Sequence, residues 1–304
     1  MVVASQDAPA GAGINPSHGS MSRERRWALR WSYVCLALFA VIFLMPPIYM
    51  LITSLKTSAE ISTAANPWWV FDPTLGNYAE LLSQQQFLIF FRNSVLVTVI
   101  VVCVTMLIAV PAAFALSRMK FWGSTSLATG VFLTYLVPET LLFIPLFKIF
   151  AELQGLTGIS FINNWWTLIF IYPTLTVPFC TWIMIGYFAS IPKELDEAAL
   201  IDGATWMQTL RLVFLPVALP GLIAAGIFAF TVSWAQFLYP MVFTTSADQL
   251  VLPVGIVTTL IKGDVFNWGQ IMTGALLTAA PPLILYAFLM DYYIAGLTSG
   301  ATKG

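Results

Sequence analysis

The chain has 304 residues, of which 59% are hydrophobic and 9% charged, with 13 Lys and Arg against 14 Asp and Glu. Soluble domains carry about 25% charged residues, so the composition excludes a soluble globular protein and a disordered chain. It also excludes a nucleic-acid binder, because no basic surplus is left to attract phosphate. We therefore predict an all-α integral membrane protein embedded in lipid.

The positions of the charges predict the membrane spans. A spanning helix needs about 20 apolar residues, because a rise of about 1.5 Å per residue must cross a hydrocarbon core about 30 Å thick. Long charge-free runs occupy residues 31–55, 93–117, 121–138, 153–192, 212–247 and 265–290. The start of the fourth run is too polar to lie in lipid, so each run provides one crossing. We predict six transmembrane helices, near 31–53, 92–116, 124–149, 165–188, 216–240 and 268–290.

The basic residues predict the orientation. Most of them lie before the first span and in the loops after the second and fourth spans, so the positive-inside rule places both termini in the cytoplasm. The chain then divides into a cytoplasmic N-terminal tail (1–30), a six-span domain (31–292) and a cytoplasmic C-terminal tail (293–304). The first apolar run is too long for a signal peptide, so the first span is expected to stay uncleaved. Either Met1 or Met21 is the start of translation.

Few residues of the chain are candidates for catalysis or metal binding. His18 is the only histidine, and Cys35, Cys103 and Cys180 fall singly inside apolar runs, so they read as small buried hydrophobic residues. We expect no metal site, no catalytic residues and no bound cofactor. No Gly is followed by Lys, so a phosphate-binding Gly-Lys-Ser/Thr loop is absent. If nucleotide energy drives this protein, another chain supplies it.

The loop at 190–216, between the fourth and fifth spans, is the segment whose sequence says most about function. Pro192 suits the first turn of a helix, the acidic residues after it complement the positive end of the helix dipole, and Gly203 can close the helix in a left-handed conformation. A short helix with an acidic and partly apolar surface is therefore predicted outside the membrane, able to dock into a groove on a partner. Its candidate contact residues are Glu194, Glu197, Ala198, Ala199, Leu200, Asp202 and Gly203.

The same loop resembles a known motif. Glu197-Ala198-Ala199, then Gly203, then Val213-Phe214-Leu215-Pro216 are similar to the EAA loop of permease subunits of binding-protein-dependent ABC importers, with Val213 where Ile is usual. From residue 31 to the C-terminus the chain resembles the carbohydrate branch of that family, in particular the maltose-type permease subunit.

The resemblance implies a type I ABC importer permease in a bacterial inner membrane. Its partners would be a second permease subunit in a heterodimer, two ATPase subunits that bind ATP and Mg, and a periplasmic or extracellular solute-binding protein. The solute would be a sugar or a sugar-like compound, moved into the cytoplasm by alternating access. The loop helix would be the coupling helix: Glu197 would bind a basic group on the ATPase, Ala198 and Ala199 would permit close approach, and Gly203 would set the bend. From the residues alone, a merely solvated acidic helix is the alternative.

The C-terminal tail has two interpretations. Its small, flexible composition is typical of a frayed end. The resemblance implies instead that it inserts between the ATPase subunits, with contacts from Thr298, Ser299 and Lys303.

A few polar residues within the spans are candidates for the substrate pathway. A carboxylate in lipid normally faces protein or water, so Glu139 either lines the pathway or is neutral and packed. Trp234, Gln236 and Tyr239 could bind a sugar through aromatic faces and amide hydrogen bonds, or could belong to an interfacial aromatic belt. The many prolines of the spans predict kinked or broken helices.

Two other classes of membrane protein fit the sequence less well. An ion-coupled secondary transporter usually has more spans or an internal repeat, with coupling-ion carboxylates at the midplane, where only Glu139 qualifies. A membrane-embedded enzyme needs catalytic residues that converge on one site.

Overall fold

The computed structural model describes residues 23–63, 68–119, 121–262 and 265–301. It separates into two units, Met1–Tyr49 and Met50–Gly304, which are described one at a time.

The described residues are almost entirely helical. The helices are α1 (Arg23–Ser54), α2 (Ser58–Thr63), α3 (Gly76–Ser83), α4 (Gln85–Arg118), α5 (Ser124–Tyr135), α6 (Glu139–Thr157), η1 (Trp165–Thr167), α7 (Leu168–Ile171), α8 (Pro173–Ser190), α9 (Glu194–Ile201), α10 (Trp206–Gln208), η2 (Thr209–Phe214), α11 (Leu215–Val217), α12 (Leu219–Trp234), α13 (Leu238–Phe243), α14 (Leu252–Leu260) and α15 (Trp268–Ala301). Two short antiparallel strands, β1 (Ile261–Lys262) and β2 (Val265–Phe266), pair Ile261 with Phe266.

The first unit contains most of α1. This 32-residue helix carries Pro46 and Pro47 in its interior, and its described side chains up to residue 49 are exposed within the analysed chain. A surface that is apolar all round is stable where lipid or another apolar surface covers it. The helix therefore agrees with the predicted first span.

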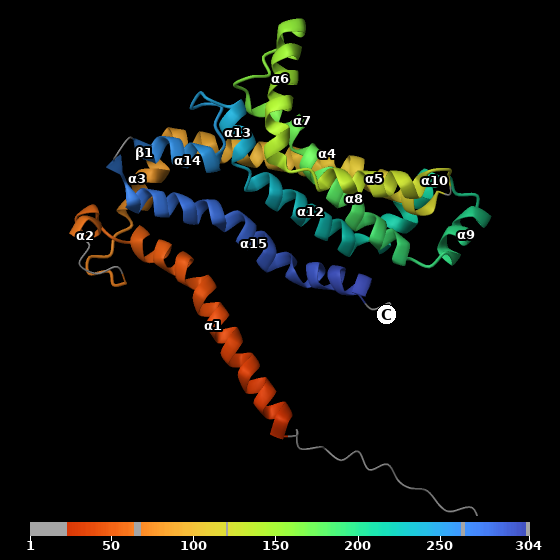
Figure 1. Cartoon of the computed structure of the whole chain (residues 1–304), viewed down its shortest axis with the longest axis horizontal. Helices are drawn as coiled ribbons and strands as arrows, with labels where there is room; N and C mark the ends of the chain where they lie inside the picture. The colour runs from red at the N-terminus through yellow and green to blue at the C-terminus, as the bar shows by residue number, and fades with distance from the viewer. Residues whose placement is uncertain (1–22, 64–67, 120, 263–264, 302–304) are drawn as a thin grey trace, which may run out of the picture. The chain divides into compact units, whose positions relative to one another are not determined.

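The second unit is built around α4. Figure 1 shows α4, α5, α8, α12 and α15 running side by side, and α4 packs against both α8 and α12. The buried stripe of α4 repeats every four residues through Val97, Val101, Thr105, Ala109 and Ala113, as one face of a helix requires. Small residues let the backbones approach closely, and polar residues can hydrogen-bond across the contact. The hydroxyls of Thr105 and Thr176 on α8 lie 2.6 Å apart.

Four of the predicted spans lie inside long apolar helices. They are 31–53 in α1, 92–116 in α4, 165–188 in the segment Trp165–Ser190, and 268–290 in α15. The described residues contain five helices long and apolar enough to cross a membrane, or six if the bent pair Trp206–Val217 and Leu219–Trp234 is one span.

The third predicted span, 124–149, has the wrong bounds. The helix stops at Tyr135 and a new one begins at Glu139, because Pro138 has no backbone N–H to continue the ladder and restricts Val137 before it. With 12 residues, α5 rises only about 18 Å, which is too short to cross a bilayer. Instead α6, which points away from the neighbouring helices in Figure 1, is long enough.

The fifth span also differs from its prediction of 216–240. The chain bends by 83° between α11 and α12, and α12 ends at Trp234. Pro216 and Pro220 flank this bend, where missing N–H groups cost least at a helix start. At the other end of the chain, α15 continues to Ala301, so residues 293–301 of the predicted C-terminal tail are helical.

Candidate functional site

The predicted loop helix is present as α9. The backbone turns at Pro192, whose carbonyl accepts from the N–H of Leu195 at 3.4 Å, and the helix runs from Glu194 to Ile201. Gly203 follows with φ +75°, and an added Cβ would meet no atom within 4 Å. The glycine is therefore needed for its left-handed backbone and not for space.

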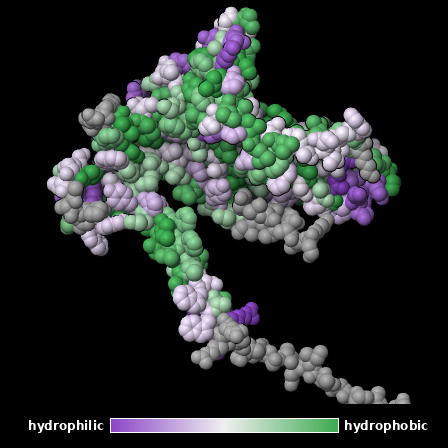
Figure 2. Space-filling view, in the orientation of Figure 1, coloured by the Kyte–Doolittle hydropathy of each residue, from purple (hydrophilic) through white to green (hydrophobic). Residues whose placement is uncertain are grey.

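One face of α9 is exposed to solvent. Glu194, Glu197 and Ala198 are exposed, and so are Leu200 at 51% and Ile201 at 85%. Figure 2 shows the hydrophilic surface around α9 next to hydrophobic surface. The exposed surface of α9 is therefore partly acidic and partly apolar.

Of the two alanines of the motif, Ala198 belongs to this surface and Ala199 does not. Ala198 is exposed, whereas Ala199 is 7% exposed and faces its own chain. The carbonyl of Ala199 accepts from the N–H of Ala204 at 2.9 Å as the chain leaves the helix. Only Ala198 of the pair is placed to permit the approach of a partner, and Ala199 permits close packing within the loop. Asp202, just beyond the helix, is exposed.

Arg118, at the end of α4, attaches α9 to the bundle. Its Nη1 lies 2.9 Å from Oδ2 of Asp196, and its Nη2 donates to the carbonyls of Phe188 and Ile191 at the end of α8. Its guanidinium carbon lies 4.8 Å from the centre of the Phe214 ring. One planar cation therefore joins α4, α8, α9 and η2. In the sequence, Arg118 is one of the basic residues that follow the second predicted span and predict the orientation. Nothing in the sequence shows that residues 70 and 78 positions away converge on it.

Aromatic rings continue this attachment into the bundle. The ring centroids of Phe114 and Phe214 are 5.1 Å apart, those of Phe188 and Phe214 5.7 Å, and those of Phe114 and Phe188 5.9 Å. All three rings are buried and meet edge to face, which favours their quadrupoles. Phe214 ends η2, a π-helical segment whose looser turn often marks functional sites. These ring contacts hold the base of the loop, from which α9 projects.

The second candidate site lies at the break between α5 and α6. A pocket of about 750 Å³ opens there, lined by residues of α5, α6, α8 and α12 and of the chain after α12. Gln236 donates from Nε2 to Oε2 of Glu139 at 2.8 Å, and the Tyr239 hydroxyl donates to the Glu139 carbonyl at 3.3 Å. Three of the four predicted pathway residues are therefore in direct contact. Glu139 and Gln236 line the pocket.

Trp234 lies apart from this group. Its indole Nε1 donates to the carbonyl of Thr278 on α15 at 2.8 Å, and its ring stacks on Phe230 at 5.6 Å. It is 3% exposed and is not among the pocket-lining residues. It joins α12 to α15.

The structure describes only part of the predicted C-terminal contact. Thr298 and Ser299 lie in the last turns of α15, while Lys303 and the alternative start Met21 lie outside the described residues.

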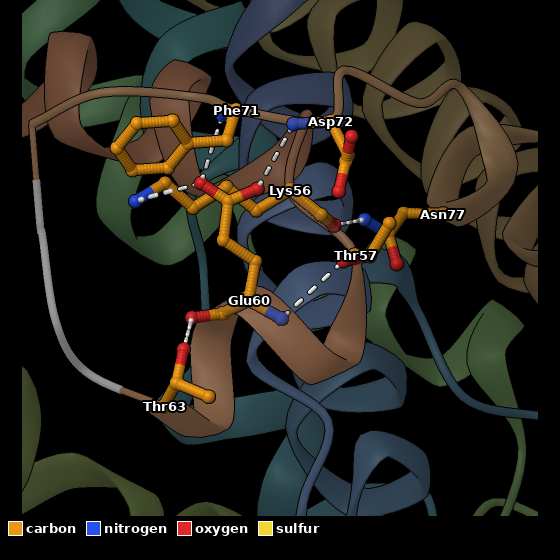
Figure 3. A network of polar contacts seen from close by, with 7 residues as sticks. All are labelled: Lys56, Thr57, Glu60, Thr63, Phe71, Asp72 and Asn77. Atoms are coloured by element: carbon orange, nitrogen blue, oxygen red, sulfur yellow. Dashed lines mark hydrogen bonds and ion pairs between the residues drawn. The ribbon is translucent and has the colours of Figure 1, made fainter.

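A polar network orders the segment that follows α1 (Figure 3). The carboxylate of Glu60 accepts from the backbone N–H groups of Phe71 at 3.1 Å and Asp72 at 3.5 Å, and lies 3.7 Å from Lys56 Nζ. Asn77 donates to the Lys56 carbonyl at 2.9 Å. Glu60 thus closes a loop between two chain segments more than ten residues apart.

Comparison with known proteins identifies the class of protein. The family described as "Binding-protein-dependent transport system inner membrane component" matches residues 105–299, more than half of the chain. The chain belongs to this family. The match contains α9, Arg118, Glu139 and Gln236.

Individual relatives are similar over nearly their whole length. The chain is 34% identical over 273 residues to the sulfoquinovosyl glycerol transport system permease protein SmoH of Agrobacterium fabrum, covering 90% of this chain and 93% of that one. It is 32% identical over 270 residues to the trehalose/maltose transport system permease protein MalG of Thermococcus litoralis, covering 88% and 94%. The fold matches a crystal structure of a bacterial ABC transporter involved in the import of alginate, with a TM-score of 0.77 at 22% identity, covering 90% and 99%.

Proposed function

We propose that this chain is one of two permease subunits of an ATP-driven importer in a bacterial inner membrane. The bent pair counts as one of six spans, and both termini are cytoplasmic. Two ATPase subunits, which hold ATP and Mg, bind the α9 surface, and a solute-binding protein delivers the solute from the other side. This chain itself is non-catalytic.

The observation that carries the proposal is the geometry of α9. The helix projects an acidic and apolar surface, Glu194, Glu197, Leu200 and Ile201, while its base is fixed to three other helical segments through Arg118. A merely solvated acidic helix needs neither exposed Leu and Ile nor an anchored base. Exposed apolar side chains rimmed by charge are typical of a protein contact. The end of α15, with Thr298 and Ser299, would reach the same ATPase subunits.

The solute is proposed to be a sugar or a sugar-like compound. The names of similar proteins include transport of sulfoquinovosyl glycerol, trehalose or maltose, and diacetylchitobiose. A further solved neighbour, with a TM-score of 0.68, is an alginate transporter in complex with a periplasmic protein that holds an alginate pentasaccharide. These solutes share hydroxyl groups and sugar rings but differ in charge.

The test is Glu197→Arg on α9, with Glu80→Arg as its matched control. Glu80 lies on α3, which Figure 1 places at the opposite end of the second unit from α9, and it is also exposed. Each variant is purified with its ATPase and reconstituted with its binding protein in liposomes. We expect Glu197→Arg to lose ATPase association and ATP-driven uptake of the solute carried by the binding protein, while Glu80→Arg keeps both.

Two results would overturn the proposal. One is unchanged ATPase association and uptake in Glu197→Arg. The other is uptake by the unsubstituted protein that survives without ATP and stops when the ion gradient is collapsed, which would favour the ion-coupled transporter.

A further inference from the structure

The pocket at the break between α5 and α6 has one carboxylate and no opposing cation. Among the described residues that line it, none is Lys, Arg or His, and Glu139 is the sole acidic one. The next basic residue along α6, Lys148, is nine residues further, or about 13 Å along the helix axis, and it lies 3.9 Å from Glu152. The charge of Glu139 therefore acts on the pocket without a neighbouring positive charge to balance it.

The carboxylate is held in position for a ligand. Its Oε2 accepts from Gln236 at 2.8 Å, which fixes the plane of the carboxylate and leaves Oε1 to accept from a further donor. Thr134 and Thr174 also line the pocket, and because their hydroxyls donate to the carbonyls of Val131 and Ile171, they are left to accept from a ligand. Acceptors, an amide and hydroxyls in one pocket suit a ligand with many hydroxyl groups, because each hydroxyl both donates and accepts.

Aromatic rings contribute the apolar part of the lining. Tyr135, the last residue of α5, and Phe237, which follows α12, both line the pocket and are 40% and 39% exposed. Aromatic rings offer large apolar faces beside polar groups, and such faces match the C–H surface of a pyranose ring. A volume of about 750 Å³ falls within the range of small-molecule sites, about 300 to 1,000 Å³.

We propose that this pocket is a solute site of the translocation pathway that selects uncharged polyhydroxylated solutes and disfavours anionic ones. The inference rests on the proposed importer function and adds the charge class of its solute. An anionic group about 4 Å from Glu139 would be repelled by a factor of about five even at the dielectric constant of water, and by more in a less polar pocket. A neutral sugar meets no such repulsion and can donate a hydroxyl to Oε1.

The test compares two probes that differ at one ring substituent, which is neutral in one probe and anionic in the other. Methyl glucoside and methyl glucuronide share one ring, but the second has a carboxylate in place of the CH₂OH group. Binding of each is measured by saturation-transfer NMR on the complete importer in nanodiscs, without the binding protein, which would impose its own selectivity. We expect the unsubstituted complex to bind the glucoside at least fivefold more tightly than the glucuronide.

Two variants reveal the source of the selectivity. Glu139→Gln keeps the shape of the side chain and removes its charge, so the ratio between the probes should fall to within twofold. Gln236→Lys places a cation beside Glu139 that balances its charge, so this variant should also bring the ratio to within twofold. Glu152→Gln is the control, because it removes a carboxylate from the same helix outside the pocket, and it should leave the ratio unchanged.

The outcomes separate this inference from the importer function. Equal binding of the two probes to the unsubstituted complex, no binding of either, or an unchanged ratio in Glu139→Gln with a normal thermal unfolding temperature would each overturn the charge-selective site. ATP-driven uptake measured on the same preparations reports the proposed function independently. If the unsubstituted complex shows no ATP-driven uptake, the proposed importer function is wrong, whatever the probes show.

Discussion

The attachment of α9 through Arg118 makes a quantitative prediction. The side chains of Arg118 and Asp196 are 5% and 17% exposed, so the ion pair is shielded from solvent. In the described part of the chain, Nε of Arg118 and Oδ1 of Asp196 are buried without a hydrogen-bond partner, so the pair is monodentate. A charge-assisted hydrogen bond contributes about 1.5 to 3 kcal/mol, and the monodentate geometry favours the lower half of that range. We expect Asp196→Asn to cost about 2 kcal/mol of unfolding free energy.

Changes at Arg118 should cost more. Arg118→Ala removes the donors to Phe188 and Ile191 and leaves Asp196 buried without its cation, which costs about 3 to 5 kcal/mol when one partner of a buried pair is lost. Arg118→Lys keeps the charge, but a single ammonium cannot reach two carbonyls and a carboxylate while stacking on Phe214. It should fall between the other two variants.

The assay is a double-mutant cycle on denaturant unfolding in detergent, paired with ATPase activity of the assembled complex. The energies of Arg118→Ala and Asp196→Ala should be non-additive by at least about 1 kcal/mol, whereas independent sites add within about 0.5 kcal/mol. Arg211→Ala, an exposed arginine on η2, is the control and should change stability by less than about 0.5 kcal/mol. Additive energies would refute the ion pair as the attachment of α9. ATP hydrolysis that stays fully coupled to uptake in Arg118→Ala would refute its role in transmitting motion.

Two further predictions concern packing and loop order. In Gly255→Ala the new Cβ would lie 2.3 Å from the buried Phe90 ring, so we expect a loss of about 1 to 3 kcal/mol of unfolding free energy in the same assay. The control is Gly226→Ala, where nothing lies within 4 Å of the new Cβ, and it should be neutral or stabilising. Equal effects of the two substitutions would contradict the close contact with Phe90. In Glu60→Ala the backbone N–H groups of Phe71 and Asp72 lose their acceptor, so their hydrogen exchange should accelerate at least tenfold. Glu80→Ala, at an exposed position, is the control and should leave this exchange unchanged. Unaltered exchange in Glu60→Ala would show that the network does not order the loop.

The sequence predicted the features that local chemistry determines. Pro192 and Gly203 enclose α9 because a proline and a left-handed glycine act on their own backbone, whatever the rest of the chain does. Charge-free runs located four of the spans because the cost of charge in lipid does not depend on packing partners. Both predictions rest on continuous segments of the chain and need no knowledge of distant contacts, which is why they agree with the structure.

The remaining features depend on contacts that sequence spacing does not encode. In a lipid-embedded helix such as α4 both faces are apolar, so the buried stripe through Val97 and Ala113 has no polar face opposite it to reveal it. The break at Pro138 was foreseen in kind, as a kinked or broken helix, but not as a new helix beginning at Glu139. The contact between Glu139 and Gln236 spans 97 positions, and only the packing of α6 against α13, just after Gln236, brings it about.

The two candidate sites share the same pair of helices. α8 begins beside Thr174, which lines the pocket, and ends at the carbonyls that Arg118 holds. α12 begins just after the 83° bend and ends two residues before Gln236. Cys180 on α8 donates to the Ala225 carbonyl on α12 at 3.4 Å, so the two helices are also joined midway.

A helix transmits displacement along its axis because its hydrogen bonds hold it as a rod. If an ATPase moves α9, the movement reaches the pocket through both ends of the loop, by α8 on one side and by α12 on the other. Glu139 lies on α6 and not on α8 or α12. A movement of these two helices relative to α6 would therefore change the distance between Glu139 and Gln236. The hydrogen bond at 2.8 Å would then be made in one state of the transport cycle and broken in the other, which would free the carboxylate of Glu139 to turn within the pocket.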